Sequence, residues 1–154
     1  MKRTLMVAMV LVAASASVGT AVADDAEKIN WVDYQTGLAR AQETERPLMV
    51  NFTAAWCKFC KQMKAETYSD PAVIAFLNEH YVASRVDTDR EPNLAREYYV
   101  RGLPTIWFLT SEGDKITNLP GYIDAPTFLQ ILDFIASEAY LELTFSEYLA
   151  AAER

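Results

Sequence analysis

The feature that most constrains this chain is a pair of cysteines, Cys57 and Cys60, set three residues apart in the stretch AAWCKFCK. They are the only two cysteines among 154 residues. The apolar run just before them, residues 48–53, predicts a short strand, and the pattern after it predicts a helix that begins near Cys57. Cys60 then lies one turn along this helix, on the same face. The fold must therefore bring two thiols together at the start of a helix that follows a strand.

The first 23 residues are expected to direct export rather than to join the fold. A basic start at Lys2 and Arg3 precedes an apolar run over residues 5–14, and Ala21-Val22-Ala23 gives the small-x-small pattern that a signal peptidase cleaves. The alternative is an uncleaved membrane anchor, because the stretch approaches the length of a membrane span. In both cases the positive end stays in the cytoplasm, so the domain that begins at about Asp24 is exported.

The charge of the expected mature chain argues against some classes of partner. Without Lys2 and Arg3, the 14 basic residues fall to twelve against 21 acidic ones, which gives a formal charge of −9. This balance disfavours nucleic acids and anionic membrane surfaces as partners. The remaining length, roughly 130 residues, suits a single domain with its own core. In an exported chain, two thiols can form a disulfide that persists.

After the leader, helical patterns alternate with strand patterns. Strands are expected at residues 48–53, 81–86, 105–109 and 115–119, the last two joined by the turn Ser111-Glu112-Gly113-Asp114. Helices are expected at residues 31–43, 57–67, 93–99 and 146–152, the last with Ser146 as its cap. Two more are expected to begin at Asp70-Pro71 and at Asp124. In the helix that begins at Asp70-Pro71, we expect Val73, Phe76 and Leu77 to be buried. This order predicts an α/β fold with a mixed central sheet that is covered by helices on both faces.

Four kinds of site could use the two cysteines. A structural zinc ion needs about four ligands, and the chain adds one histidine, His80, which is typical of a surface or capping residue. Two thiolates alone could hold a copper ion, because soft metals accept sulfur ligands. A disulfide that closes so short a loop would stabilise the fold very little. A dithiol redox centre is favoured, because the helix N-terminus with Lys58 and Lys61 stabilises a thiolate on Cys57.

Two motifs resemble the signatures of the thioredoxin-fold family. Residues 56–61, WCKFCK, resemble its W-C-x-x-C-K active site, and residues 101–105, RGLPT, resemble the loop that bears a cis-proline beside the thiols. The likeness, which extends from about residue 48 to residue 135, implies a thioredoxin fold with its core at about residues 48–138 and an extra C-terminal helix in the tail, residues 140–154. Within the family, the chain is most similar to exported members, in particular to the C-terminal periplasmic domain of the disulfide-interchange protein DsbD.

The resemblance also implies roles for the residues around the thiols. Cys57 attacks the substrate disulfide, Cys60 resolves the mixed disulfide, and Pro104 helps to receive the substrate. The backbone of Leu103 is then free to pair with an extended target segment. Trp56 is expected to form a flat cover over the thiols.

Three departures from the family pattern affect the expected chemistry. Asn51 stands where many members carry a buried carboxylate, and an amide cannot accept a proton from Cys60. Lys58 and Phe59 replace a frequent Gly-Pro pair, and we expect Lys58 to act electrostatically and Phe59 to contact substrates. Arg85 replaces a lysine on the next strand, which keeps the charge but not its acid-base chemistry.

These features predict an exported, periplasmic thiol-disulfide oxidoreductase that reduces protein disulfides through Cys57 and Cys60. Two alternatives stay open: a disulfide oxidant or isomerase, and a redox-inactive copper-binding or chaperone module. The expected partners are protein disulfide substrates and an inner-membrane thiol-disulfide electron donor, with no nucleic acid. We expect no cofactor beyond the redox-active disulfide and no metal ion, and we expect the chain to act as a monomer.

Overall fold

The computed structural model describes residues 28–152, so the expected signal peptide, residues 1–23, lies outside the described residues. The strands are β1 Trp31–Val32, β2 Leu48–Thr53, β3 Val82–Asp87, β4 Thr105–Leu109 and β5 Lys115–Pro120. The helices are α1 Tyr34–Thr44, α2 Lys58–Glu66, α3 Pro71–His80, α4 Pro92–Glu97, α5 Ala125–Ala136, the short 3₁₀ helix η1 Ala139–Leu141, and α6 Phe145–Ala152. Within residues 28–152, every helix is too short or too polar to cross a bilayer.

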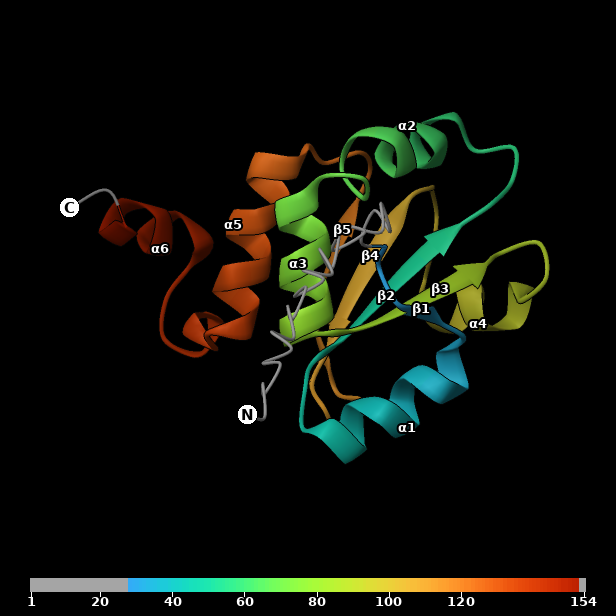
Figure 1. Ribbon diagram of the computed structural model, residues 1–154. Helices are drawn as coiled ribbons and strands as arrows, with labels where there is room; N and C mark the ends of the chain where they lie inside the picture. The colour runs from blue at the N-terminus through green and yellow to red at the C-terminus, as the bar shows by residue number, and fades with distance from the viewer. Residues whose placement is uncertain (1–27, 153–154) are drawn as a thin grey trace, which may run out of the picture.

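The five strands form one mixed sheet in the order β1-β3-β2-β4-β5 (Figure 1). Strands β1, β3 and β2 run parallel, whereas β4 pairs antiparallel with both β2 and β5. The mixed sheet that the sequence predicts is therefore confirmed. Its central strand, β2, ends at Thr53, just before the two cysteines, and places Asn51 between Arg85 of β3 and Ile106 of β4.

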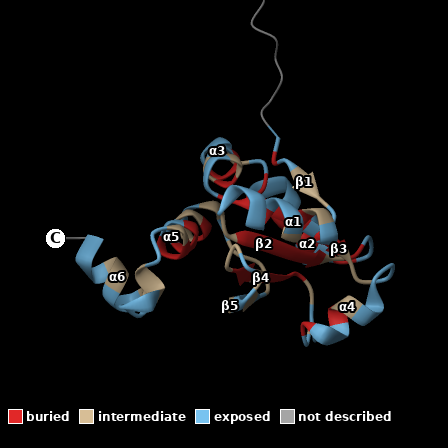
Figure 2. Cartoon of the chain, turned by 90° about the horizontal axis from the view of Figure 1, so that it is seen from below, coloured by how far each residue is buried: buried red, intermediate tan, exposed pale blue. Residues whose placement is uncertain are grey.

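Helices cover both faces of the sheet, as the order of elements predicts (Figure 1). Helices α2, α3 and α5 pack on one face, and α1 and α4 pack on the other. Strand β2 contributes to both layers, because its side chains alternate between faces: Met49 enters the first core, and Leu48, Val50 and Phe52 enter the second. By the same alternation, Asn51 lies on the α2 face. Figure 2 shows that the buried residues concentrate in the sheet and in the helix faces that meet it.

Aspartates set the start of three helices. Asp33, Asp70 and Asp124 each accept a hydrogen bond from a backbone N–H in the first turn, at 2.9 Å. Pro71 follows Asp70 as the first residue of α3, where its missing N–H removes no helical hydrogen bond. Because these caps are local, the sequence alone predicted the helix starts at Asp70 and Asp124.

The first expected element, a helix over residues 31–43, is wrong at its N-terminal end. Trp31 and Val32 form β1, which pairs with Ala83 and Ser84 of β3, and the helix begins only after the Asp33 cap. A strand of two residues is too short to give a periodic pattern. Its pairing depends on β3, which is distant in the sequence.

Two further details of the helices differ from the expectation. On α3, Ile74 is buried in place of Phe76, which is partly buried at the edge of the core. The tail helix is capped by Thr144, not by Ser146: the Thr144 hydroxyl accepts the backbone N–H of Glu147, and the Glu147 carboxylate accepts the backbone N–H of Thr144. This reciprocal pair is a capping box, and it places the cap two residues earlier than expected, so that the helix begins at Phe145.

Candidate functional site

The two cysteines form a disulfide at the N-terminus of α2, with their Cα atoms 5.3 Å apart. Cys57 is the N-cap of this helix, and its Sγ accepts the backbone N–H of Cys60 at 3.1 Å. The turn that leads into the helix is closed by a hydrogen bond from the N–H of Cys57 to the carbonyl of Ala54. The chain thus reaches the cysteines directly from the end of β2, which gives the disulfide a rigid support.

The same position favours a thiolate on Cys57 when the bond is reduced. The unpaired N–H groups at a helix start and the positive end of the helix dipole both stabilise negative charge. The N–H that now donates to the Cys57 sulfur is one such group. Lys58 and Lys61 lie exposed on the first turn of α2 and add positive charge. A thiolate is the nucleophile in disulfide exchange, so the site is equipped for that chemistry.

Both cysteines are buried in the disulfide form. Cys57 is 4% exposed and Cys60 is 9% exposed, and they form a small apolar cluster with Ala54, against which Leu103 packs. An incoming sulfur therefore has only limited access to the bond. The residues that border the disulfide on this side, here called the rim, decide which molecules approach.

The loop before β4 contributes one side of the rim. The peptide bond between Leu103 and Pro104 is cis, as the resemblance implies. The carbonyl of Pro104 accepts the N–H of Gly121 at 2.8 Å, and the hydroxyl of Thr105 donates to the carbonyl of Gly102 at 2.8 Å. Within the described residues, Leu103 has no backbone-to-backbone hydrogen bond. Its backbone is therefore open to pairing with another chain, while the loop around it is fixed.

Exposed side chains from the other side complete the rim. Trp56 is 67% exposed, and its indole N–H donates to the carboxylate of Asp89 at 3.0 Å. Phe59 is 52% exposed, and Lys58 is also exposed. The hydrogen bond holds the Trp56 ring toward the loop that follows β3. Its expected role as a cover over the thiols stays a prediction.

Behind the disulfide, Asn51 lies where the family resemblance would place a carboxylate. Asn51 is 4% exposed, and its Oδ1 has no hydrogen-bond partner among residues 28–152. It lines a cavity of about 320 Å³ that is also lined by Cys60. The charged residues around this cavity are Lys61, Lys64, Arg85 and Asp87. The inner side of the disulfide therefore carries more positive than negative charge.

Two other side chains in this region have altered acidity. Burial raises the pKa of Tyr68, an effect that the nearby Arg85 partly offsets, so the phenol stays protonated over the whole ordinary pH range. Burial also lowers the pKa of Arg85. A guanidinium is nevertheless charged at any pH at which the protein is folded. Neither group can take the proton that Cys60 must lose.

The structure brings most of the predicted site residues together. Cys57, Cys60 and Leu103 are in contact, with Pro104 next in the chain, and Asn51 lines the inner cavity. Sequence reasoning missed Asp89, the partner of Trp56. The sequence did offer one signal: Asp89 closely follows β3, and the carboxyl ends of parallel strands meet at one edge of the sheet.

Other residues of the inner cavity also escaped sequence reasoning. Lys64, Tyr68 and Asp87 come from the late part of α2, the turn after it and the end of β3. No spacing in the sequence brings these three positions together. No group of three or more His, Cys, Asp or Glu residues able to hold a metal ion occurs within residues 28–152.

Comparisons with known proteins agree with this geometry. Residues 34–136 match a family model described as "Thioredoxin-like domain". The thiol:disulfide interchange protein DsbD of Vibrio vulnificus (strain CMCP6) is 34% identical over 114 residues, which cover 70% of this chain and 19% of that protein. The chain thus spans about a fifth of the length of the curated relatives that it matches.

Two solved structures are informative. A thioredoxin from Thermus thermophilus superimposes with a TM-score of 0.65 and 33% sequence identity, covering 70% of this chain and 87% of that chain. The reduced form of the C-terminal domain of DsbD from Neisseria meningitidis gives a TM-score of 0.54 and 25% identity, covering 67% of this chain and 96% of that one.

Proposed function

The chain belongs to the thioredoxin-like family, and its expected thioredoxin fold with an extra C-terminal helix is confirmed. From this premise we propose that the protein is an exported thiol:disulfide oxidoreductase that reduces disulfides in other proteins. The observation that carries the proposal is the disulfide between Cys57 and Cys60 at the start of α2, next to the Leu103–Pro104 loop. Its relatives named as thiol:disulfide interchange proteins support the same class of activity.

The proposed reaction begins from the dithiol form. The Cys57 thiolate attacks one sulfur of a substrate disulfide, which forms a mixed disulfide and releases the other substrate sulfur as a thiolate. The Cys60 thiolate then attacks the Cys57 sulfur, breaks the mixed disulfide and releases the second substrate thiolate. Two electrons pass to the substrate. The Cys57–Cys60 disulfide that remains is the state that the structure describes.

The rim residues would hold the substrate for this attack. An extended segment beside the disulfide could pair with the free backbone of Leu103, in the way that a strand adds to a sheet edge. Trp56 and Phe59 present apolar surface next to it. Lys58 supplies positive charge close to the position of the attacking thiolate. These contacts depend on main-chain geometry and apolar area, so we expect the protein to accept unfolded or extended segments.

The direction of electron flow rests on the likeness to a reducing domain. A protein that reduces substrates returns to its disulfide form after each round, so it needs a source of electrons. We propose that an inner-membrane thiol-disulfide protein supplies them in the periplasm. The signal-peptide pattern of residues 1–23 supports export, and the relatives' names support thiol-disulfide exchange.

The reduction of insulin disulfides, with dithiothreitol as the electron source, tests the proposal. The wild-type protein should accelerate the reduction, and Cys57→Ala should lose at least about a hundredfold of the rate, because the remaining thiol, Cys60, lacks the helix N-cap position that favours a thiolate on Cys57. Circular dichroism checks that the variant is folded. A Cys57→Ala variant with full activity would contradict the proposal.

The two alternatives give different results in the same set of measurements. A disulfide oxidant would pass its disulfide to a reduced peptide faster than its dithiol form reduces insulin. A copper-binding module would bind one Cu(I) per chain and block labelling of both thiols without accelerating insulin reduction. Either outcome would replace the proposed reductase function.

A further inference from the structure

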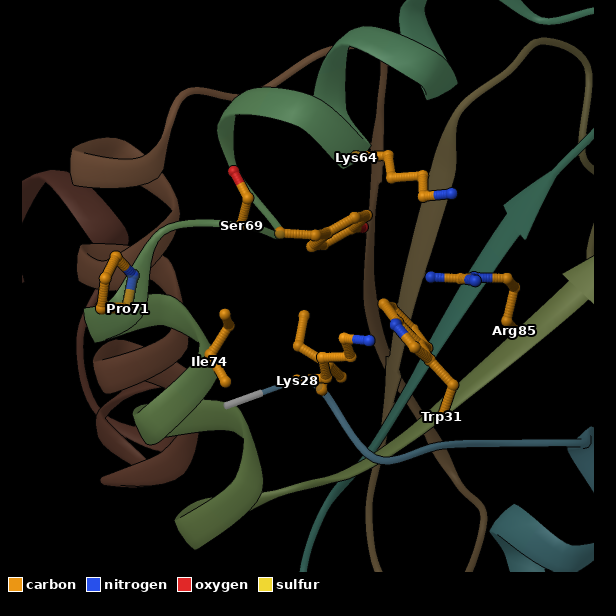
Figure 3. A pocket seen from close by; sticks show the side chains of 9 residues that line it. Lys28, Trp31, Lys64, Ser69, Pro71, Ile74 and Arg85 are labelled. Carbon is orange, nitrogen blue, oxygen red and sulfur yellow. The ribbon is translucent and has the colours of Figure 1, made fainter. Parts of the chain in front are cut away.

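A second cavity, of about 540 Å³, opens on the α2 and α3 side of the sheet next to β1 (Figure 3). Its walls are mainly apolar and include Trp31, Tyr68 and Ile74. The rings of Trp31 and Tyr68 meet edge to face, with their centroids 5.2 Å apart. Cavities of about 300–1,000 Å³ with mostly apolar walls are typical of small-molecule sites. The two aromatic rings favour a ligand with a flat apolar body.

Among residues 28–152, the charged groups that line this cavity are all positive. They are Lys28, Lys64 and Arg85, and no aspartate or glutamate of the described residues lines it. Figure 3 shows Lys64 and Arg85 reaching toward the same part of the opening. The Arg85 guanidinium carbon lies 4.2 Å from the centroid of the Trp31 ring. Among residues 28–152, neither Lys64 nor Arg85 forms an ion pair. Two uncompensated cations beside an aromatic wall would attract a negatively charged group.

A buried hydroxyl provides the second polar feature. Tyr68 is 8% exposed, lines the cavity, and its hydroxyl has no hydrogen-bond partner among the described residues. Buried polar atoms in folded proteins are nearly always hydrogen-bonded, so an unpartnered one at a cavity wall indicates a missing partner. Because burial keeps the phenol protonated, this hydroxyl can donate to an acceptor. An anion placed near Lys64 and Arg85 supplies such an acceptor.

We propose that this cavity binds a small organic anion whose flat apolar body lies against Trp31. Its carboxylate or sulfonate group contacts Lys64 and Arg85 and accepts the hydrogen bond of the Tyr68 hydroxyl. Lys64, Tyr68 and Arg85 also line the smaller cavity that Cys60 borders. The anion site therefore lies on the inner side of the redox centre, away from the rim formed by Trp56 and Phe59.

A fluorescence titration of the oxidised protein with 8-anilinonaphthalene-1-sulfonate tests the proposal. This probe joins a flat apolar body to one sulfonate. We expect saturable binding of one probe per chain, about tenfold weaker in Arg85→Gln and at least about threefold weaker in Lys64→Gln. Arg90→Gln is the matched control, because Arg90 is an exposed arginine outside the cavity, and it should bind within about twofold of wild type. Lys64→Gln, an exposed change on α2, remains informative if Arg85→Gln lowers the thermal stability.

Two further measurements distinguish a specific site from nonspecific binding of the probe. The uncharged analogue N-phenyl-1-naphthylamine should bind at least about tenfold more weakly than the sulfonate. In NMR spectra, the indole N–H of Trp31 should shift on addition of the sulfonate, whereas those of Trp56 and Trp107 should not. The proposal is overturned if binding does not saturate, if the uncharged analogue binds equally well, if Arg90→Gln weakens binding as much as Arg85→Gln, or if the shifts appear at Trp56 instead of Trp31.

Discussion

On its outer side the Cys57–Cys60 disulfide is bordered by exposed aromatic rings and a free stretch of backbone, whereas on its inner side it is bordered by a buried amide and several cations. The outer rim is built from Trp56, Phe59 and Leu103. The inner wall contains Asn51, together with the basic side chains Lys61, Lys64 and Arg85. The outer side can receive a partner chain. The inner side places positive charge near the sulfurs.

This difference suggests a division of work between the two cysteines. Cys57 is the helix cap next to the rim, where a substrate sulfur arrives. Cys60 lines the inner cavity, where no carboxylate stands at the position of Asn51. The cavity that Cys60 lines holds three cations and one carboxylate, Asp87, and this excess of positive charge favours the thiolate form of Cys60. Changes at the rim should therefore alter substrate binding, and changes at the inner wall should alter stability and resolution.

The largest effect is expected for Cys60→Ala. This variant keeps the attacking thiol at the rim and loses the resolving thiol of the inner side. Turnover in insulin reduction should fall at least about a hundredfold, while the first attack continues and a mixed disulfide accumulates. Mass spectrometry under non-reducing conditions measures the adduct, and Cys57→Ala serves as the control that should form none. An adduct on Cys57→Ala but not on Cys60→Ala would reverse the assignment of the two cysteines.

An intermediate effect on stability is expected for Asn51→Leu. The Asn51 Oδ1 is buried without a partner among residues 28–152, and such an atom costs about 1–3 kcal/mol of stability. A leucine of similar shape removes this cost, so the free energy of unfolding in urea should rise by about 1 kcal/mol. The matched control is Ser84→Ala, which removes an unpartnered buried hydroxyl on the opposite face of the sheet.

The comparison of these two variants is informative. If both variants raise the free energy of unfolding, the unpartnered Asn51 amide lowers stability in the same way as the unpartnered Ser84 hydroxyl. A clear loss of stability in Asn51→Leu alone would mean that the amide has a partner in the inner cavity. That result would contradict the account of this wall as an unpartnered polar surface.

The smallest effect is expected at the rim, for Phe59→Ala. Phe59 is 52% exposed, so the free energy of unfolding should change by less than about 0.5 kcal/mol. Lost apolar contact with the substrate should raise KM for insulin about threefold with little change in kcat. Leu141→Ala is the control, because Leu141 is a 69% exposed apolar residue on η1, outside the site. Equal changes in KM for both variants would show that Phe59 does not contact the substrate.

The parts of the fold that the sequence predicted depend on local interactions. Asp70 and Asp124 cap their helices through contacts within one turn, and the strand that ends at Thr53 is mostly apolar. Trp31 and Val32 were wrongly predicted as the start of a helix, because their strand exists only through pairing with β3. The tail is an exception to this division: its capping box, Thr144 with Glu147, is also local, but Ser146 fits a cap equally well by residue type.

The same contrast holds within the site. Cys57, Cys60 and Pro104 lie in two short motifs and were predicted by residue number. Lys64 comes from the last turn of α2 and Tyr68 from the turn after it, and only the packing of that segment over the sheet brings them to the cavity beside Cys60. Motifs reveal the reacting atoms, whereas the surrounding charges and cavities depend on tertiary packing.

The reduction potential of the Cys57–Cys60 pair tests the proposed function most directly. It can be measured by equilibrating the protein with mixtures of reduced and oxidised glutathione or dithiothreitol and then alkylating the free thiols. The account predicts a reversible couple at about −200 to −270 mV, the range of disulfide-reducing proteins. A potential above about −150 mV would identify an oxidant, and a bond that stays closed below about −300 mV would identify a structural disulfide. Either result would contradict a reductase.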